Sequence, residues 1–515
     1  MARETELKLA LPIAAQRQFL RHPVLGKAVA RQTRQLTNLY YDTPSLALHR
    51  RGIALRLRKQ GRIWLQTVKC AGDSAGGLSS RPEWETPYAG YFDFSAIDAE
   101  PVRRWLQRPR LGSNIVPLFE TNFQRTTWRF EPWPGCALLL MLDRGWIVAA
   151  GRREAISEVE IELACAADPS CIDELFNLAQ ALGAHLPLIP ALASKAERGY
   201  RLFQGAPLVP QKARPVPLRP SLSSIETFRL IMLECLRHLQ ANQEGAASSD
   251  DAEFIHQMRV AARRMRAALR LFQPCLPDGY AEDVLPPLQR LMLLLGHARD
   301  LDVLFGDIAG PVVHALPDEP RLAALVDAVV DRQHRAHAIA VEYLVSPAHG
   351  QLLLQATAQL HRPPFVAAGV GENSMEGAVA PESVCDFAAA RLRRLRNKVK
   401  ALAALANCDD PVSLHRLRIA IKRLRYALEF FAPLAEPRAT QRLLRQLTRL
   451  QDELGQLHDL ANAGLLLMQC SGSDARLREA VSLVGGWHVA RYNELLGRLP
   501  KRLDKLAQQR LPELG

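Results

Sequence analysis

The sequence predicts an α+β chain of two parts, a β-rich N-terminal domain followed by an all-helical, internally duplicated C-terminal domain. Three observations lead to this prediction. Charged and apolar residues alternate, with the period of a strand, through the first 203 residues. After a proline-rich stretch, apolar residues recur with the period of a helix. Within that second part, one segment repeats another at a fixed offset.

The first strand is expected at residues 4–11, which read ETELKLAL. Glu4, Glu6 and Lys8 alternate with mostly apolar residues and therefore share one face of a strand. An exposed strand with one solvated face has the same pattern, so this stretch alone leaves both interpretations open.

Later strand patterns carry charges that are sorted by sign. A solvated face usually mixes signs, because like charges on neighbouring positions repel. The sorting therefore favours charged faces that are turned toward a common interior. The charged positions are Arg56 and Arg58 in ALRLRK, Lys69 in WLQTVK, Glu83 and Glu85 in RPEWET, and Glu158, Glu160 and Glu162 in SEVEIEL.

We place the first domain at residues 1–203, a linker at 204–221 and the helical domain at 222–515. The linker contains five prolines in 18 residues, a density that no helix or strand tolerates. Within the helical domain, we expect copies at about 222–362 and 381–515. The glycine-rich stretch 363–383 is expected to join them.

The two copies match without a gap over some eighty residues. HQMRVAARRMRAALRLFQP, from His256, aligns with HRLRIAIKRLRYALEFFAP, from His415, at an offset of 159. The same offset pairs Asp300 with Asp459. We therefore expect a duplicated helical bundle with pseudo-two-fold symmetry.

The repeated helix carries a basic stripe in each copy. A solvated face usually has glutamates spaced for pairing with basic residues, and neither stripe contains one. The recurrence of a histidine at the start of both stripes favours an anion contact over a half-buried polar residue. The anion-binding candidates, including two neighbouring arginines, are His256, Arg259, Arg263, Arg264, Arg266, His415, Arg418, Lys422, Arg423 and Arg425.

Composition limits the partners and the location. A net charge of +13 favours polyanions, and the absence of aromatic residues from both stripes argues against specific nucleic-acid binding. Nine scattered cysteines without a Cys-x-x-Cys pair suit reduced thiols. The start has no signal-peptide pattern, and the longest strongly apolar run, 136–142, is too short to span a membrane. We expect a cytoplasmic protein without a membrane partner.

If the charged strand faces line a closed barrel, its interior holds both cations and carboxylates. Lysines and arginines would neutralise a chain of phosphates. The cationic candidates are Lys8, Arg56, Arg58, Lys69 and Arg125. Carboxylates would instead hold Mg²⁺ or Mn²⁺, which bridges carboxylate and phosphate oxygens. The pattern predicts metal-assisted attack of water on a terminal phosphoryl group.

The first 203 residues resemble the CYTH, or triphosphate tunnel metalloenzyme, family. ETELK is similar to its Glu-x-Glu-x-Lys signature, and the further motifs follow in family order. They are NLYYDTP at 38–44, ALRLRK at 54–59, WLQTVK at 64–69, RPEWE at 81–85, Arg125 in FQRTTW, Asp143 in MLDRG, SEVEIEL at 157–163 and SKAERGY at 194–200. The resemblance implies an eight-stranded antiparallel β-tunnel.

It also implies roles for the matching residues. The phosphate contacts would be Lys8, Arg56, Arg58, Lys69, Arg125 and Lys195. The carboxylates that hold metal or position water would be Glu4, Glu6, Glu83, Glu85, Asp143, Glu158 and Glu160. Glu162 completes the last alternating face, and the resemblance leaves open which two of Glu158, Glu160 and Glu162 ligate the metal.

The helical part resembles the CHAD domain, which is recognised by duplicated His-x-x-Arg helices and associated with inorganic polyphosphate. Together the resemblances predict an inorganic triphosphatase that uses Mg²⁺ or Mn²⁺, acts on tripolyphosphate and binds long-chain polyphosphate. Association with polyphosphate granules is left open. Three alternatives also remain open: a class IV adenylate cyclase, a thiamine triphosphatase, and a non-enzymatic polyphosphate scaffold.

Overall fold

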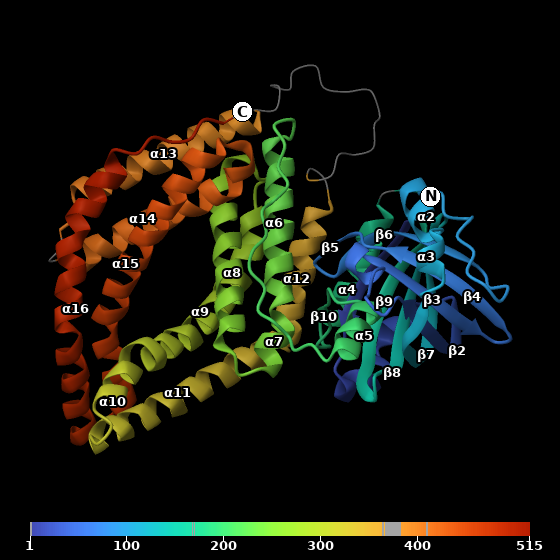
Figure 1. Cartoon of the computed structure of the whole chain (residues 1–515), viewed down its shortest axis with the longest axis horizontal. Helices are drawn as coiled ribbons and strands as arrows, with labels where there is room; N and C mark the ends of the chain where they lie inside the picture. Colours follow the sequence, from blue (N-terminus) through green and yellow to red (C-terminus); the bar gives the residue numbers. More distant parts are fainter. Residues whose placement is uncertain are drawn as a thin grey trace. The chain divides into compact units, whose positions relative to one another are not determined.

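The computed structural model describes residues 3–166, 168, 170–362, 365, 383–407 and 410–514, which form two compact units (Figure 1). The first unit contains the residues up to Val209 and also helix α12 (Pro347–Leu360). The second contains Pro210–Tyr343 and the described residues from Ser383 onward. Most of the expected connecting loop at 363–383 lies outside the described residues, and the domain limits read from the sequence stay a prediction.

The first unit is a closed barrel of eight antiparallel strands within the described residues, as predicted. In order around the barrel these are β1 (Arg3–Ala10), β9 (Arg152–Ala166), β8 (Cys136–Ala149), β7 (Val116–Trp133), β2 (Ala30–Asp42), β3 (Ile53–Gln60), β4 (Ile63–Cys70) and β6 (Leu78–Pro87). The barrel closes because β1 pairs with both β9 and β6. Short strands β5 (Asp73–Ala75) and β10 (Ile189–Pro190) extend β6 and β1.

Strand alternation separates the two faces of β1. Leu7 and Leu9 are fully buried on the outside of the barrel, in a core with Phe176 of helix α4 (Cys171–Gly183). Glu6 and Lys8, on the opposite face, line the interior. The period of the sequence therefore sets which side chains enter the barrel.

Helix α12 completes that outer core. Its Leu354 and Ala358 belong to the same buried cluster as Leu7 and Phe176. The packing is close, since a Cβ atom on Gly350 would lie 2.3 Å from the backbone oxygen of Leu188. Thus a helix from the second half of the sequence is an integral part of the barrel unit.

Helix α5 (Lys195–Gln204) packs against β7 and β8. It begins with a capping box, in which Ser194 and Glu197 satisfy each other's backbone N–H groups. Tyr200 anchors the helix through edge-on contact with Phe119. The remaining α-helices of this unit are short: α1 (Gln16–Phe19), α2 (Glu100–Leu106) and α3 (Pro109–Gly112).

The second unit is all helical, as predicted. The first copy comprises α6 (Ser224–Ala241), α7 (Gln243–Ser248), α8 (Ala252–Phe272), α9 (Tyr280–Val303), α10 (Gly310–Ala315) and α11 (Pro320–Leu344). The second comprises α13 (Val384–Ala404), α14 (Pro411–Phe431), α15 (Pro437–Ser471) and α16 (Ala475–Ala507). No helix among the described residues is long and apolar enough to cross a membrane.

Equivalent residues of the two copies meet in this unit. The rings of Phe272 and Phe431, which are 159 positions apart, lie 5.9 Å from each other. Each also contacts the phenylalanine of the first helix in its own copy, Phe228 or Phe387. This shared aromatic centre joins α8 to α14, the two helices that carry the basic stripes.

Candidate functional site

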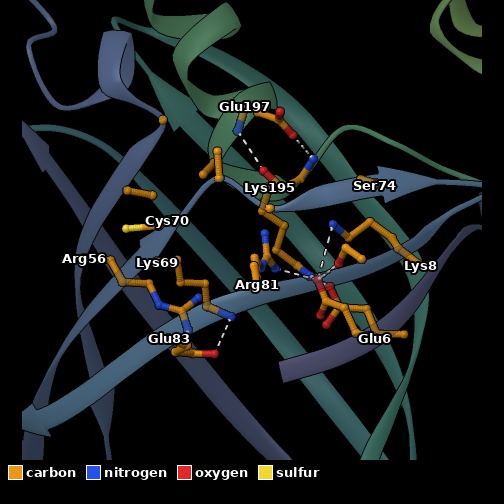
Figure 2. A pocket seen from close by; sticks show the side chains of 18 of the residues that line it. Glu6, Lys8, Arg56, Lys69, Cys70, Ser74, Arg81, Glu83, Lys195 and Glu197 are labelled. Carbon is orange, nitrogen blue, oxygen red and sulfur yellow. Dashed lines mark hydrogen bonds and ion pairs between the residues drawn. The ribbon is translucent and has the colours of Figure 1, made fainter. Parts of the chain in front are cut away.

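The barrel encloses a cavity of about 480 Å³ lined by charged side chains of both signs (Figure 2). Twelve of its charged residues come from the strands and from the start of α5. They are Glu6, Lys8, Arg56, Arg58, Lys69, Arg81, Glu83, Glu85, Arg125, Glu160, Glu162 and Lys195. Of the other residues predicted from the sequence, Asp143 and Glu158 lie buried beside this cavity, and the side chain of Glu4 lies outside the described side chains.

The deepest group is an acidic cluster of Asp143, Glu158 and Glu160. Strand register brings it together, because Asp143 on β8 lies opposite Glu158 on β9 and opposite Arg125 on β7. Arg125 donates two hydrogen bonds to Asp143, at 2.7 and 2.6 Å, and one to Glu160 at 2.5 Å. The Nζ atom of Lys195 lies 2.7 Å from Asp143 and 3.0 Å from Glu160, and it also pairs with Glu158.

These contacts govern ionisation in the cluster. Burial raises the pKa of Glu160, but the charges of Lys195, Arg125 and Lys8 outweigh burial and hold that pKa well below its usual value. Burial lowers the pKa of Lys195, and its three carboxylate neighbours more than reverse the effect. Glu160 and Lys195 therefore carry opposite charges in direct contact at neutral pH.

Glu6 forms a second group on β1 and β6. Its Oε1 atom lies 2.5 Å from Arg81 and 3.8 Å from the Nζ atom of Lys8, and it accepts a hydrogen bond from Ser79. Glu6 and Lys8 are both at least 95% buried, so their charges act in a medium that screens weakly. Glu6 and Lys8, which were predicted to share one face of the first strand, therefore lie together in the cavity.

A third group lies on β3, β4 and β6. Lys69 pairs with Glu83 at 2.8 Å, and Arg56 lies 3.5 Å from the same carboxylate. Arg58 donates to Asn38 at 3.0 Å. Burial and the charges of Arg56 and Arg125 lower the pKa of Arg58 to about 10. An anion in the cavity would relieve this repulsion among cations.

Two basic residues of this region, Arg81 and Arg198, are not among those predicted from the sequence. Arg81 belongs to the same alternating face as Glu83, two positions before it in RPEWET, so the period already indicated it. Arg198 lies nearly one turn after Lys195 and contacts Glu158 at 3.2 Å. Both residues lie in SKAERGY, and residues three apart on a helix are neighbours on its surface, so helical spacing indicates Arg198 as well.

The acidic cluster has donors that suit a hard divalent cation. Oxygen atoms of Asp143, Glu158 and Glu160 lie within 4.8 Å of one another, and carboxylate oxygens are the ligands that Mg²⁺ and Mn²⁺ prefer. The ammonium group of Lys195 contacts all three carboxylates. These three carboxylates therefore fit a divalent metal. In the structure, Arg125 and Lys195 balance their negative charge.

The helical unit contains a larger cavity, of about 1010 Å³, to which both basic stripes contribute. Helices α8, α13 and α14 supply its basic lining: Arg259, Arg263, Arg266, Arg270, Arg391, Arg394, Lys398, His415, Arg418, Lys422 and Arg423. The lining residues of α13 belong to a basic run in the sequence, RLRRLRNKVK at 391–400. The structure brings its members to the same cavity as the two stripes.

Three of the anion-binding candidates are not part of that lining. Arg264 and Arg425 both pair with Glu429, at 2.9 and 2.6 Å. Glu429 follows Arg425 by four residues, the spacing of a helical ion pair, so the sequence contained this signal just beyond the end of the stripe. His256 lies outside the cavity lining, with its pKa lowered by burial and by Arg299.

Burial and repulsion among cations together lower the pKa values of basic groups in this cavity. Burial, together with Arg263, Arg418 and Arg259, lowers the pKa of Lys422 to about 6. Burial and Arg259 lower the pKa of Arg263 to about 10. The Nε atom of Arg418 is buried and has no hydrogen-bond partner among the described residues. An anionic ligand would neutralise the basic groups of the cavity and would accept a hydrogen bond from the Nε atom of Arg418.

Both parts of the chain match known domain families. Residues 2–200 match the CYTH domain family, and residues 230–467 match the CHAD domain family. An inorganic triphosphatase of Haemophilus influenzae is 30% identical over 202 residues, which are 39% of this chain and 55% of that protein. The match thus spans about half the length of that curated relative.

Two solved structures are also similar. The CHAD domain from Ricinus communis is 31% identical, with a TM-score of 0.52, over 60% of this chain and 99% of that one. A putative adenylyl cyclase from Hippeastrum, whose structure is described as revealing a dominant triphosphatase activity, is 21% identical, with a TM-score of 0.27, over 40% of this chain and 98% of that one.

Proposed function

Because this chain contains a CYTH domain and a CHAD domain, we propose that it is an inorganic triphosphatase, dependent on Mg²⁺ or Mn²⁺, whose helical domain binds long-chain polyphosphate. The proposed reaction is hydrolysis of tripolyphosphate to pyrophosphate and phosphate. The observation that carries it is the cavity in the barrel, where basic side chains and carboxylates line one enclosed space. Phosphoryl transfer needs both, because it depends on positioning and on neutralising charge.

The walls of the cavity favour an inorganic substrate over a nucleotide. Its aromatic rings are engaged in packing: Phe123 lies under the cationic groups of Arg125 and Lys195, and Tyr40 stacks on Phe119 at 4.6 Å. Stacking with a base would need an aromatic face that is open to the cavity. The charged lining, by contrast, offers basic groups to a bare chain of phosphates.

In the proposed mechanism, the basic groups of the lining bind the phosphate oxygens and fix the terminal phosphorus in line with a water molecule. A divalent cation held by Asp143, Glu158 and Glu160 would supply further positive charge for the phosphates and would lower the pKa of a bound water. The water oxygen bonds to the terminal phosphorus while the bridging P–O bond breaks, and pyrophosphate leaves. A carboxylate of the cavity takes up the proton that the water releases.

The activity is tested by phosphate release from tripolyphosphate, long-chain polyphosphate, ATP and thiamine triphosphate, each with Mg²⁺, with Mn²⁺ and with a chelator. We expect release to be fastest from tripolyphosphate and to stop when the chelator is added. Faster release from ATP or from thiamine triphosphate would favour an organic substrate. Release that persists in the chelator would contradict the metal-dependent mechanism.

Polyphosphate binding is proposed for the cavity of the helical unit. Its basic groups come from both copies of the repeat, so a long chain contacts two stripes at once, and the second contact forms at high effective concentration. Each phosphate contact also releases counterions, which makes affinity fall steeply as the salt concentration rises. These properties suit a long flexible polyanion.

Binding of polyphosphate is expected to depend on pH through Lys422. Its pKa is about 6 in the free protein, and a bound polyanion raises it because repulsion is replaced by attraction. The complex therefore takes up a proton above pH 6, and affinity should be highest below pH 6 and fall as the pH rises. Titration calorimetry in buffers of different ionisation enthalpy counts these protons.

The matched control is Lys422→Arg, which keeps the positive charge throughout this range. The terminal phosphates of the ligand also take up or release protons, and they do so equally with both proteins. The difference in proton uptake between wild type and variant therefore belongs to Lys422. We expect the variant to take up fewer protons on binding than the wild type. Equal proton uptake by both would contradict the assignment to Lys422.

A further inference from the structure

Lys195 occupies the centre of the acidic cluster. Its Nζ atom contacts three carboxylates that come from two strands, at 2.7 Å for Asp143, at 3.0 Å for Glu160, and in direct contact with Glu158. The side chain is 7% exposed, and its tip enters from the first residue of α5. The cluster thus converges on one cation that belongs to the protein.

The same oxygen atoms are the donors that fit a divalent metal. Such a metal takes carboxylate oxygens at about 2.1 Å and repels a neighbouring ammonium group. A metal that takes oxygen atoms from all three carboxylates needs the central position that the ammonium group of Lys195 now occupies. Occupation of the cluster by the ammonium group and by the metal is therefore mutually exclusive.

We propose that Lys195 is an internal counter-ion of the metal site, which leaves the cluster when metal binds and then turns toward the phosphates of the substrate. This inference rests on the proposed function, since it concerns the same cavity. Lys195 already lines the cavity, so its ammonium group has space to move into. Metal and tripolyphosphate then bind cooperatively, because the substrate accepts the cation that the metal displaces.

The backbone around Lys195 supports a movement of the side chain alone. The capping box holds the start of α5, with Ser194 N–H donating to Glu197 at 2.6 Å and Glu197 N–H donating to Ser194 at 3.2 Å. Arg125 is suited to stay, since its planar guanidinium binds Asp143 through two hydrogen bonds. A lysine is a point charge on a flexible chain and can exchange partners.

The test is the affinity of the full chain for Mn²⁺, measured by calorimetry without phosphate in wild type and in Lys195→Gln. We expect the variant to bind Mn²⁺ at least tenfold more tightly, because the competing ammonium group is gone. Lys69→Gln is the matched control. It removes the same charge from the same cavity, but Lys69 pairs with Glu83 and not with the acidic cluster. A gain in Lys195→Gln that is absent, or no larger than the gain in Lys69→Gln, would overturn the proposal.

Thermal unfolding gives a second measurement. Without Lys195, three buried carboxylates lose a cation, so Tm without metal should fall below that of wild type. Mn²⁺ should then raise Tm more in Lys195→Gln than in wild type, because it takes over the vacated place. A variant that fails to fold both with and without Mn²⁺ also counts against the proposal, since the metal would then be unable to replace the ammonium group.

These outcomes are separate from the test of the proposed function. If wild type hydrolyses tripolyphosphate with metal but Lys195→Gln gains no affinity, only the role of Lys195 fails. If Lys195→Gln gains affinity while wild type releases no phosphate, the competition stands and the triphosphatase proposal fails.

Discussion

Replacing Glu6 with Gln is expected to lower the turnover of tripolyphosphate at least ~100-fold, which is the usual cost of losing a prearranged electrostatic contact. Glu6 is 2% exposed and lies in the cavity between Arg81 and Lys8. The amide keeps the shape of the side chain but removes its charge, so the variant loses a carboxylate to which the CYTH resemblance gives a role in holding metal or positioning water. Phosphate release at saturating substrate and Mn²⁺ measures the effect.

Lys8→Ala should lower turnover to a similar extent for a different reason, because Lys8 is assigned to the phosphates. We expect the glutamate variant to need more Mn²⁺ for half-maximal rate and the lysine variant to need more tripolyphosphate. Glu131→Gln is the control, since Glu131 is an exposed residue of β7 that pairs with the exposed Arg129. Near-wild-type turnover in both cavity variants, with their melting curves unchanged, would remove this site from the mechanism.

The double variant Arg263→Gln, Arg418→Gln should weaken long-chain polyphosphate binding on the order of 100-fold, because each charge-assisted contact contributes about 1.5 kcal/mol or more. The two residues come from different copies of the repeat and line one cavity. Short chains should lose less, since they do not bridge both copies. Binding is measured on the full chain at fixed salt, with duplex DNA as a competitor.

The same double variant should unfold at a temperature no lower than that of wild type. Its arginines are half-buried, and burial together with the neighbouring Arg259 lowers the pKa of both, so removing them relieves a cost of burying charge in the free protein. Arg393→Gln, Arg416→Gln is the control, with two exposed arginines of α13 and α14 that lie outside the cavity. If both double variants lost the same binding affinity, the loss would follow from the lower net charge of the protein and not from contacts in the cavity.

The sequence predicted the fold and much of the cavity because both follow from local periods. Alternation along a strand determines that Glu6 and Lys8 share a face, and the closed barrel turns that face inward. The repeat likewise predicted that both copies would present Arg263 and Lys422 in equivalent ways. Patterns of this kind need no knowledge of distant contacts.

Side-chain partners and long-range packing were harder to predict. Arg425 falls on the basic stripe, yet Glu429 holds it away from the cavity lining. Lys195 lies among three carboxylates because of where α5 begins relative to β8 and β9. This placement is a long-range contact that a local sequence pattern does not predict. The packing of α12 against the barrel joins segments more than 150 residues apart, and its apolar residues look like those of any bundle helix.

The position of α12 also bears on the order in which the protein is made. A ribosome that has reached Val209 has completed every strand of the barrel among the described residues, but Leu354 and Ala358 of the outer core are still untranslated. At typical rates of synthesis, roughly 150 further residues take about 8 to 30 s. During that interval the nascent barrel has an uncovered apolar face, and its core closes only after part of the helical domain has left the exit tunnel.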